Sequence, residues 1–306
     1  DLLKDLQEDA KSHGGMAVIL ITHDLNMVSH FADRVAVMYQ GKLLECKSTE
    51  EVFSHPDHPY TNSLVNSKPV RNVLPLVPIA PVLLKAEQVS VAYQSSQVVK
   101  AISFGLNAGE IGCLVGPSGS GKTSLLRLLS GMYRPQEGWV KLDGVDISQL
   151  SKPLIADNMG YLQQEGRLFA GSLRDNLILG LMDPGDQAIL DASKLTGLHD
   201  AVIAQHPQGL HRPIFEGGQG LSGGQKQLVN LTRVFLRQPR IWLLDEPTAA
   251  MDRHFESRVM QSLTRQIQSD DTLVLVTHKP EMLQLVERLI VVANHGIVLD
   301  GPRNEV

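Results

Sequence analysis

The chain has 306 residues, of which 42% are hydrophobic and 20% are charged, and its formal net charge is −5 at pH 7. This composition is typical of a globular protein with room for one large α/β domain and a further piece, and the acidic balance argues against nucleic acid as a partner. The two cysteines, Cys46 and Cys113, have no paired spacing, which argues against disulfides or a cysteine metal site and fits a reducing cytosol.

The first part of the chain, about residues 1–70, reads as the end of an α/β domain. It begins at Asp1 without a methionine and inside an amphipathic pattern, so we expect residues to precede it. The pattern then predicts, in order, a strand at 17–21, a helix, a strand at 32–38, a turn at Gly41 and a short strand at 43–44. His55, Asp57 and His58 could suggest a metal site, but the flanking prolines favour a polar turn.

A proline-rich linker is expected at about 71–82. None of the apolar runs reaches the ~18 to 20 residues that a membrane-spanning helix needs. The nearest candidate, residues 73–84, is interrupted by Pro75, Pro78 and Pro81, which would break a helix.

The second domain, about residues 83–306, alternates apolar strands with helical segments. The predicted elements are strands at 89–93, before Asn107, at 111–115, at 241–244 and at 272–276, a helix at 124–130, a hairpin turn at Asp143-Gly144, and a mostly helical stretch at 168–237. Buried strands alternating with helices predict a mostly parallel sheet flanked by helices.

A glycine-rich loop joins the strand at 111–115 to the helix at 124–130. It reads Gly-Pro-Ser-Gly-Ser-Gly-Lys-Thr and fits the phosphate-binding P-loop. Glycines let the backbone curl tightly and bring its N–H groups against phosphate oxygens, while the following helix adds its positive end. Lys122 would reach the β- and γ-phosphates, and the Thr123 hydroxyl would bind Mg²⁺. The predicted nucleotide-binding residues of this loop are Gly116, Pro117, Ser118, Gly119, Ser120, Gly121, Lys122, Thr123 and Ser124.

About a hundred residues later, the chain reads Leu-Ser-Gly-Gly-Gln at 221–225. Together with the P-loop, this pentapeptide resembles the ATP-binding cassette (ABC) ATPases. In that family, the segment covers the γ-phosphate of ATP bound to the opposite subunit, through a serine hydroxyl and helix-terminal N–H groups. The resemblance therefore implies that a dimer of cassettes, homomeric or heteromeric, is required. The implied nucleotide-binding residues are Ser222, Gly223, Gly224 and Gln225.

The pair Asp245-Glu246, at the end of an apolar strand, resembles the Walker B motif. The resemblance implies that Asp245 holds Mg²⁺, through water, and that Glu246 acts as general base for the attacking water or orients it. His278, after the strand at 272–276, resembles the family's switch histidine, which contacts the γ-phosphate. The implied catalytic residues are Glu246, His278 and Lys122.

Two further positions carry implied roles in the same family. Gln164 resembles the Q-loop glutamine, which touches Mg²⁺ and senses the transmembrane partner, with Gln163 as a rival. The implied metal-binding set is therefore Thr123, Gln164 and Asp245. Tyr93 resembles the aromatic residue that stacks on adenine.

Two stretches narrow the resemblance. Glu216, within residues 215–220, and the segment 169–176 are similar to exporter-type cassettes, and 83–306 looks most like type I secretion ATPases, which are usually fused to a transmembrane domain. Residues 1–70 instead resemble the truncated C-terminal tail of oligopeptide or dipeptide importer ATPases, in which His23 matches the switch histidine. The segments 17–45 and 272–300 form a partial repeat, although only one P-loop is present.

The resemblance implies an α/β P-loop NTPase cassette, with a mostly parallel core sheet, an antiparallel β subdomain and a helical signature subdomain. It implies an ATP-hydrolysing subunit of an ABC transporter that works with transmembrane permease subunits, peripherally on the cytoplasmic face of the membrane. The sequence leaves two alternatives open: a soluble ABC ATPase acting on ribosomes or DNA, and a fusion of two gene fragments.

Overall fold

The computed structural model describes residues 18–22, 28–29, 31–39, 41–65, 80–93 and 96–304. It divides the chain into two compact units, residues 1–68 with 252–254 and residues 69–251 with 255–306. His23 and residues 71–79 of the expected linker lie outside the described residues. Val82, the last residue of that expected linker, already begins a strand.

In its described residues, the first unit contains a β-hairpin followed by the short helices α3 and α4. Strands β1 (Arg34–Tyr39) and β2 (Lys42–Ser48) pair antiparallel, and the chain turns between them at Gly41, whose φ is 76°. They are followed by α3 (Thr49–Ser54) and α4 (Pro59–Val65). The Ser48 and Glu51 side chains cap the start of α3 reciprocally, and Val35, Val37 and Val52 form a small core.

The strand predicted at 17–21 is wrong for the part that is described. Residues 18–22 form no strand, and the side chains of Ile19 and Ile21 are 91% and 96% exposed. A strand requires neighbours for its N–H and C=O groups, and within the described part of this unit the only sheet is the β1–β2 pair. His55, Asp57 and His58 lie in the irregular segment between α3 and α4, as the predicted polar turn requires.

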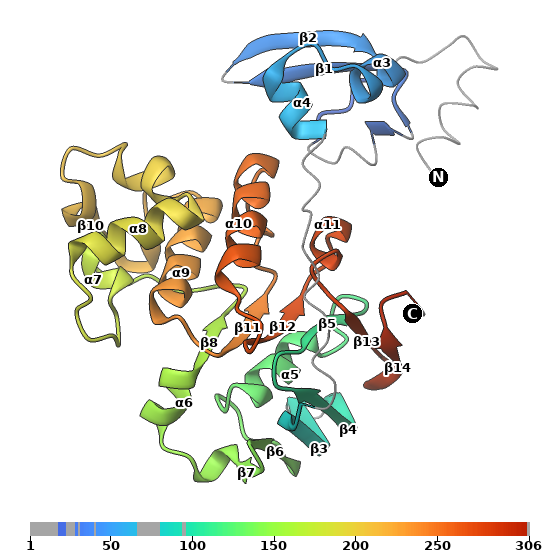
Figure 1. The fold of residues 1–306 in the computed structure, drawn as a ribbon, viewed down its shortest axis with the longest axis vertical. Coiled ribbons are helices and arrows are strands. Elements are labelled where there is room, and N and C mark those ends of the chain that lie inside the picture. Colours follow the sequence, from blue (N-terminus) through green and yellow to red (C-terminus); the bar gives the residue numbers. More distant parts are fainter. Residues whose placement is uncertain are drawn as a thin grey trace. The chain divides into compact units, whose positions relative to one another are not determined.

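The second unit is built on a six-stranded sheet (Figure 1). Its strands are, in spatial order, β14 (Gly296–Pro302), β13 (Arg288–Ala293), β5 (Ile111–Val115), β12 (Thr272–Val276), β11 (Ile241–Asp245) and β8 (Met159–Leu162). All neighbours pair in parallel except β13 and β14. The predicted mostly parallel sheet is confirmed.

Strand periodicity divides the core of this unit between the two faces of the sheet. Successive side chains of a strand point to opposite faces, so Trp242 and Leu244 of β11 join one hydrophobic cluster while Ile241 and Leu243 join the other. The first cluster includes residues of α8 (Asp186–Thr196), α9 (Gly223–Arg237) and α10 (Arg253–Gln266). The second includes α5 (Lys122–Leu129) and the antiparallel sheet. The sheet is therefore buried on both faces, as parallel sheets are.

The second, antiparallel sheet of this unit has the order β4-β3-β6-β7. Its strands are β3 (Val82–Tyr93), β4 (Ser96–Asn107), β6 (Glu137–Leu142) and β7 (Val145–Asp146). Asp143 and Gly144 both have positive φ, at 49° and 78°, and form the predicted hairpin turn between β6 and β7.

The remaining elements connect these sheets and build the helical part. They are the turn η1 (Ile147–Gln149), α6 (Lys152–Asn158), β9 (Gly171–Ser172), α7 (Leu173–Leu177), the π-helical turn η2 (His199–Ile203), η3 (Gly209–His211), β10 (Pro213–Ile214), η4 (Glu216–Gly218) and α11 (Pro280–Leu283). The stretch 168–237 is mostly helical, as predicted, although the sequence did not reveal the short pairing of β9 with β10.

Candidate nucleotide-binding site

Three neighbouring strands bring the predicted site residues to one edge of the sheet. β5, β12 and β11 lie side by side and run parallel, so their carboxyl ends meet at the same edge (Figure 1). The glycine-rich loop follows β5, Asp245 ends β11, and His278 lies two residues after β12. Ligands of α/β sheets bind at this carboxyl edge.

The glycines of the loop 116–121 differ in why the structure requires them. Gly116 has a φ of 148°, and a Cβ there would collide with the Val292 carbonyl oxygen. Gly121 has a φ of 101°, and its Cβ would lie 2.9 Å from the Val99 side chain. Gly119 has a φ of 77° but nothing lies within 4 Å of a Cβ, so this glycine faces open space. The loop is therefore pressed against the protein at both ends and open in its middle.

Lys122 is buried and bonded to the loop that it follows. Its Nζ donates to the carbonyl oxygens of Gly116 at 2.8 Å and Pro117 at 2.7 Å. Burial lowers the pKa of the Lys122 ammonium, while the carboxylates of Glu246 and Asp245 oppose that shift. Because Gly121, at the start of α5, provides no side-chain cap, the first N–H groups of this helix have no side-chain partner there. A lysine and an uncapped helix start together suit an anionic ligand.

Asp245 has the most unusual environment among these residues. Its side chain is fully buried, and neither carboxylate oxygen has a hydrogen-bond partner in the part of the chain that the structure describes. Burial raises the pKa of this carboxyl, and the Thr123 hydroxyl and nearby cations such as Lys122 oppose that rise. A buried carboxylate without a partner is costly, and an oxygen-ligated cation would relieve that cost. Asp245 and Thr123 therefore fit a Mg²⁺ site in their donor chemistry.

Glu246 directly follows the Walker B strand in a left-handed backbone conformation, with a φ of 50°. Its N–H donates to the Val276 carbonyl oxygen at 2.9 Å, and its Oε1 lies 3.3 Å from Nε2 of His278. Burial raises the pKa of the Glu246 carboxyl, and the neighbouring His278 lowers it. A carboxyl with a raised pKa, at 8% exposure, is suited to accept a proton.

Tyr93 lies at the end of β3, close to the helix that follows the P-loop. Its hydroxyl is 3.4 Å from Oγ of Ser124, and its ring meets that of Tyr133 edge to face at 6.2 Å. The Arg127 guanidinium lies 5.5 Å from the centre of the Tyr133 ring. Tyr93 and Tyr133 are 40% and 39% exposed, so both offer aromatic surface to a ligand. Sequence reasoning missed Tyr133, for which the only signal was an aromatic residue shortly after the P-loop helix.

The two candidate Q-loop glutamines lie after β8, at the edge strand of the same sheet. Gln164 is exposed in the turn that follows β8. The Gln163 amide lies 3.5 Å from Sδ of Met132. No hydrogen bond or ion pair in the described part of the chain joins Gln164 to Asp245 or to Glu246.

The signature segment forms the start of α9. Ser222 is its N-cap: its Oγ accepts from the Gln225 N–H at 3.2 Å, and Oε1 of Gln225 accepts from the Ser222 N–H at 3.0 Å. Nε2 of Gln225 donates to the Ala201 carbonyl oxygen at 3.0 Å, so this side chain is engaged within the chain. Ser222 and Gly223 are exposed. Within the described residues, no hydrogen bond joins this segment to the P-loop.

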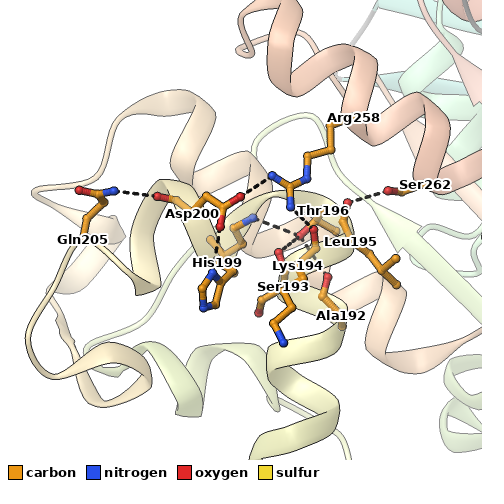
Figure 2. Close-up of polar contacts among 11 residues, drawn as sticks. Ala192, Ser193, Lys194, Leu195, Thr196, His199, Asp200, Gln205, Arg258 and Ser262 are labelled. Atoms are coloured by element: carbon orange, nitrogen blue, oxygen red, sulfur yellow. Dashed lines mark hydrogen bonds and ion pairs between the residues drawn. The ribbon is translucent and has the colours of Figure 1, made fainter. Parts of the chain in front are cut away.

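The turn that Gln225 contacts is fixed to α10 by a polar network (Figure 2). Arg258 donates to the Asp200 carboxylate at 2.5 Å and to the Lys194 carbonyl oxygen at 2.6 Å. One residue along α8, the Leu195 carbonyl oxygen accepts from Ser262 at 2.6 Å. These bonds hold the C-terminal end of α8 and the turn η2 against α10. The turn η2 in turn contacts Gln225, so the network supports the signature segment.

The two exporter-like stretches lie together. The Glu216 carboxylate accepts from the Ala170 N–H at 3.4 Å, and the Gly217 N–H donates to the Leu168 carbonyl oxygen at 3.0 Å. A hollow of about 390 Å³ is lined by the end of β8, the segment after it and one side of α9. Phe169 and Leu179, at its rim, are about half exposed.

Comparisons with known proteins show which family the chain resembles. Residues 99–249 match the model of the ABC transporter family. An uncharacterised ABC transporter ATP-binding protein of Bacillus subtilis is 32% identical over 230 residues, which cover 75% of this chain and 38% of that protein. A putative multidrug export ATP-binding/permease protein of Staphylococcus aureus is 31% identical over 222 residues, covering 72% of this chain and 38% of that protein.

A solved structure shows the same likeness. The structure of a bacterial Atm1-family ABC exporter with ATP bound superposes with a TM-score of 0.68 at 28% identity, over 75% of this chain and 41% of that one. The chain therefore spans about two fifths of these three proteins. None of the helices in the described residues combines the length and hydrophobicity that a membrane crossing needs. The second unit of this chain is an ATP-binding domain of the ABC transporter family.

Proposed function

We propose that this chain hydrolyses ATP between two cassettes and passes the resulting movement to a transmembrane partner. One observation carries the proposal: the ends of three adjacent parallel strands bring together Lys122, Asp245 and the Glu246–His278 pair. The buried Asp245 carboxylate, which lacks a hydrogen-bond partner in the described part of the chain, supplies the acidic group that a cation-dependent phosphoryl transfer needs.

Nucleotide binding is assigned to the P-loop and the start of α5. In the proposed complex, Lys122 exchanges its bonds to the loop carbonyls for bonds to the β- and γ-phosphates. The open backbone around Gly119 and the first N–H groups of α5 hold the remaining phosphate oxygens. Adenine stacks on the exposed aromatic surface of Tyr93.

Mg²⁺ is assigned to the Thr123 hydroxyl and the Asp245 carboxylate, with the exposed Gln164 completing the set when nucleotide is bound. Bound there, Mg²⁺ neutralises the charge that develops on the phosphate oxygens. Asp245 fits this role because its carboxylate is already buried and hydrogen-bonded to nothing in the described residues.

Hydrolysis is assigned to Glu246 and His278. A water attacks the γ-phosphorus as the bond to the ADP oxygen breaks, and Glu246 orients that water or accepts its proton. His278 contacts the γ-phosphate from the next strand end. The products are ADP and inorganic phosphate, and the charge of the transferred group is stabilised by Lys122 and the P-loop N–H groups.

Completion of the site is assigned to a second cassette. The exposed N-terminal turn of α9 offers the Ser222 hydroxyl and backbone N–H groups near Gly224, which suit the γ-phosphate of ATP held by the other copy. Each dimer would then hold two sites, and each copy would contribute to both.

The transmembrane partner is assigned to the hollow between β8 and α9. Its half-exposed apolar rim at Phe169 and Leu179 suits a short amphipathic segment, and the loop of Glu216 lies beside it. In this proposal the chain works peripherally on the cytoplasmic face of a membrane. The transported substrate would be selected by the partner.

The test is ATP turnover by the wild-type chain beside Glu246→Gln. We expect the variant to bind ATP with unchanged affinity, to dimerise with it and to lose turnover by at least about 100-fold. Turnover within a few-fold of wild type would remove Glu246 from the proposed mechanism. An absence of ATP binding in the wild type would overturn the proposal as a whole.

A further inference from the structure

One buried glutamine of α9, Gln227, bonds to the backbone on both sides of the catalytic turn. Its Nε2 donates to the Glu246 carbonyl oxygen at 2.6 Å, and its Oε1 accepts from the Ala250 N–H at 3.0 Å. The side chain is 7% exposed. Gln227 therefore connects the signature helix to both ends of the segment 246–250.

Two glycines at the start of α9 allow the Gln227 side chain to reach its partners. Gly223, Gly224 and Gln227 are spaced i, i+1 and i+4, so Gln227 shares a helix face with both glycines. A Cβ on Gly224 would lie 2.7 Å from the Ala250 carbonyl oxygen, and one on Gly223 would lie 3.6 Å from the Ala250 Cβ. The glycines thus allow the Ala250 turn to approach the helix closely, and the amide of Gln227 closes the contact.

The bond to the Glu246 carbonyl acts on a strained residue. A non-glycine residue with a φ of 50° costs about 1 kcal/mol or more relative to an ordinary conformation. Three hydrogen bonds to its backbone hold Glu246 there: its N–H donates to Val276, and its carbonyl oxygen accepts from Ala249 at 3.1 Å and from Gln227. The Gln227 bond is the shortest of the three, and it is the only one made by a side chain.

A neutral primary amide satisfies both partners. The Glu246 carbonyl requires a donor and the Ala250 N–H requires an acceptor, and the primary amide of glutamine presents one of each. An ionised carboxylate offers acceptors only, and a thioether offers no donor. The identity of the two partners also fixes which end of the amide is nitrogen.

We propose that Gln227 is a positioning residue that holds Glu246 in its left-handed conformation and thereby aims the Glu246 carboxylate at the reacting phosphate. The inference rests on the proposed role of Glu246. Because Gln227 lies on the helix that begins with Ser222, it also links a chain's own catalytic turn to the segment that covers the nucleotide of its partner.

The test compares Gln227→Met, which has a similar length and no amide, with Gln227→Glu. The ionised carboxylate of Gln227→Glu keeps an acceptor for Ala250 but opposes the Glu246 carbonyl, so kcat is measured up to about pH 9, where a buried carboxyl ionises more fully. We expect each to lower kcat about 10- to 100-fold while the affinity for ATP, measured without Mg²⁺, changes by less than about 3-fold. Thr232→Val is the control. Thr232 lies on the same helix as Gln227, and this change removes its buried hydrogen bonds to the Leu228 carbonyl oxygen and to Thr196 of α8. The kcat of this variant should stay near the wild-type value.

Three results would overturn the inference: an unchanged kcat in Gln227→Glu, an equal loss of kcat in Thr232→Val, or a loss confined to ATP affinity. If Gln227→Met does not fold, Gln227→Glu alone carries the comparison. In the Glu246→Gln background, Gln227→Glu should cost no further turnover, because the group that it positions is already disabled. Full turnover in Glu246→Gln itself would instead refute the proposed function, so the two failures are distinguishable.

Discussion

Nε2 of His278 lies 3.3 Å from Oε1 of Glu246, although 32 residues separate them along the chain. The parallel pairing of β11 and β12, in which Asp245 lies opposite Val276, places the two residues beside each other at the sheet edge. The Glu246 side chain is 10% exposed, whereas that of His278 is 55% exposed. The histidine is therefore the member of the pair that solvent or a ligand can reach.

Replacing His278 by alanine should reduce turnover without abolishing ATP binding. The variant loses the imidazole that we place on the γ-phosphate, while the P-loop contacts are unchanged. We expect kcat to fall about 10- to 1000-fold with an ATP affinity within a few-fold of wild type. His206→Ala, which changes a histidine of the helical part, is the control. A His278→Ala variant with wild-type kcat would remove this residue from the site.

Asp245→Asn should stabilise the nucleotide-free protein at neutral pH and weaken its response to Mg²⁺. Burial raises the pKa of the Asp245 carboxyl above its unfolded value of 3.8, so this group imposes no penalty on folding below that pH. As the pH rises from 3.8 through the folded pKa, the folded state loses stability relative to the unfolded state, because the carboxyl becomes charged while it is buried. We expect the melting temperature of the variant to exceed that of wild type by about 2–5 °C at pH 7 and to match it near pH 3.5.

The same pair of proteins tests the metal assignment. Adding Mg²⁺ with ATP should raise the melting temperature of wild type much more than that of Asp245→Asn, because bound ligand stabilises only the folded state that holds it. Equal Mg²⁺-dependent shifts in both proteins would contradict the role of Asp245 as a ligand.

The two signature glycines should differ in their tolerance of alanine. A Cβ on Gly224 would press on the Ala250 carbonyl oxygen at 2.7 Å, whereas one on Gly223 would make ordinary contact at 3.6 Å. Gly224→Ala should therefore displace the turn that Gln227 holds and lower kcat at least about 10-fold more than Gly223→Ala. The comparison is made by steady-state turnover, with melting curves to confirm folding. Equal effects would show that close packing against Ala250 does not matter.

Thiol labelling should separate the two cysteines. Cys113 is fully buried in strand β5, and burial raises the pKa of its thiol to about 12. At pH 8, about one in 10⁴ of these thiols is ionised, and the thiolate is the reactive form. Cys46 is exposed. We expect mass spectrometry to find an alkylating reagent on Cys46 alone until the protein is unfolded. Rapid labelling of Cys113 in a folded Cys46→Ser variant would contradict the buried position of β5.

Much of the second unit could be predicted from local patterns. The short apolar runs before the P-loop and before Asp245 match β5 and β11, because strands buried on both faces read as continuous hydrophobic segments. The convergence of Lys122, Asp245 and His278 at one sheet edge follows from the parallel order of those strands.

Other features depend on contacts that no local pattern encodes. The segment 17–21 reads like β12 in sequence, yet residues 18–22 form no strand, whereas β12 lies between β5 and β11. The left-handed conformation of Glu246 and the bridge made by Gln227 arise only when α9 packs against the end of β11. Likewise, Tyr133 meets Tyr93 only through the fold.

The most direct test of the account mixes two inactive chains. Lys122→Ala disables the P-loop, and Ser222→Arg blocks the signature turn; each variant alone should lack turnover. A mixed dimer would contain one site built from the intact P-loop of one copy and the intact Ser222 of the other. Equal mixing should therefore restore up to about one quarter of the wild-type rate, if half of the dimers are mixed and one of their two sites works. No recovery at any ratio, with mixed dimers present, would contradict a site shared between two cassettes.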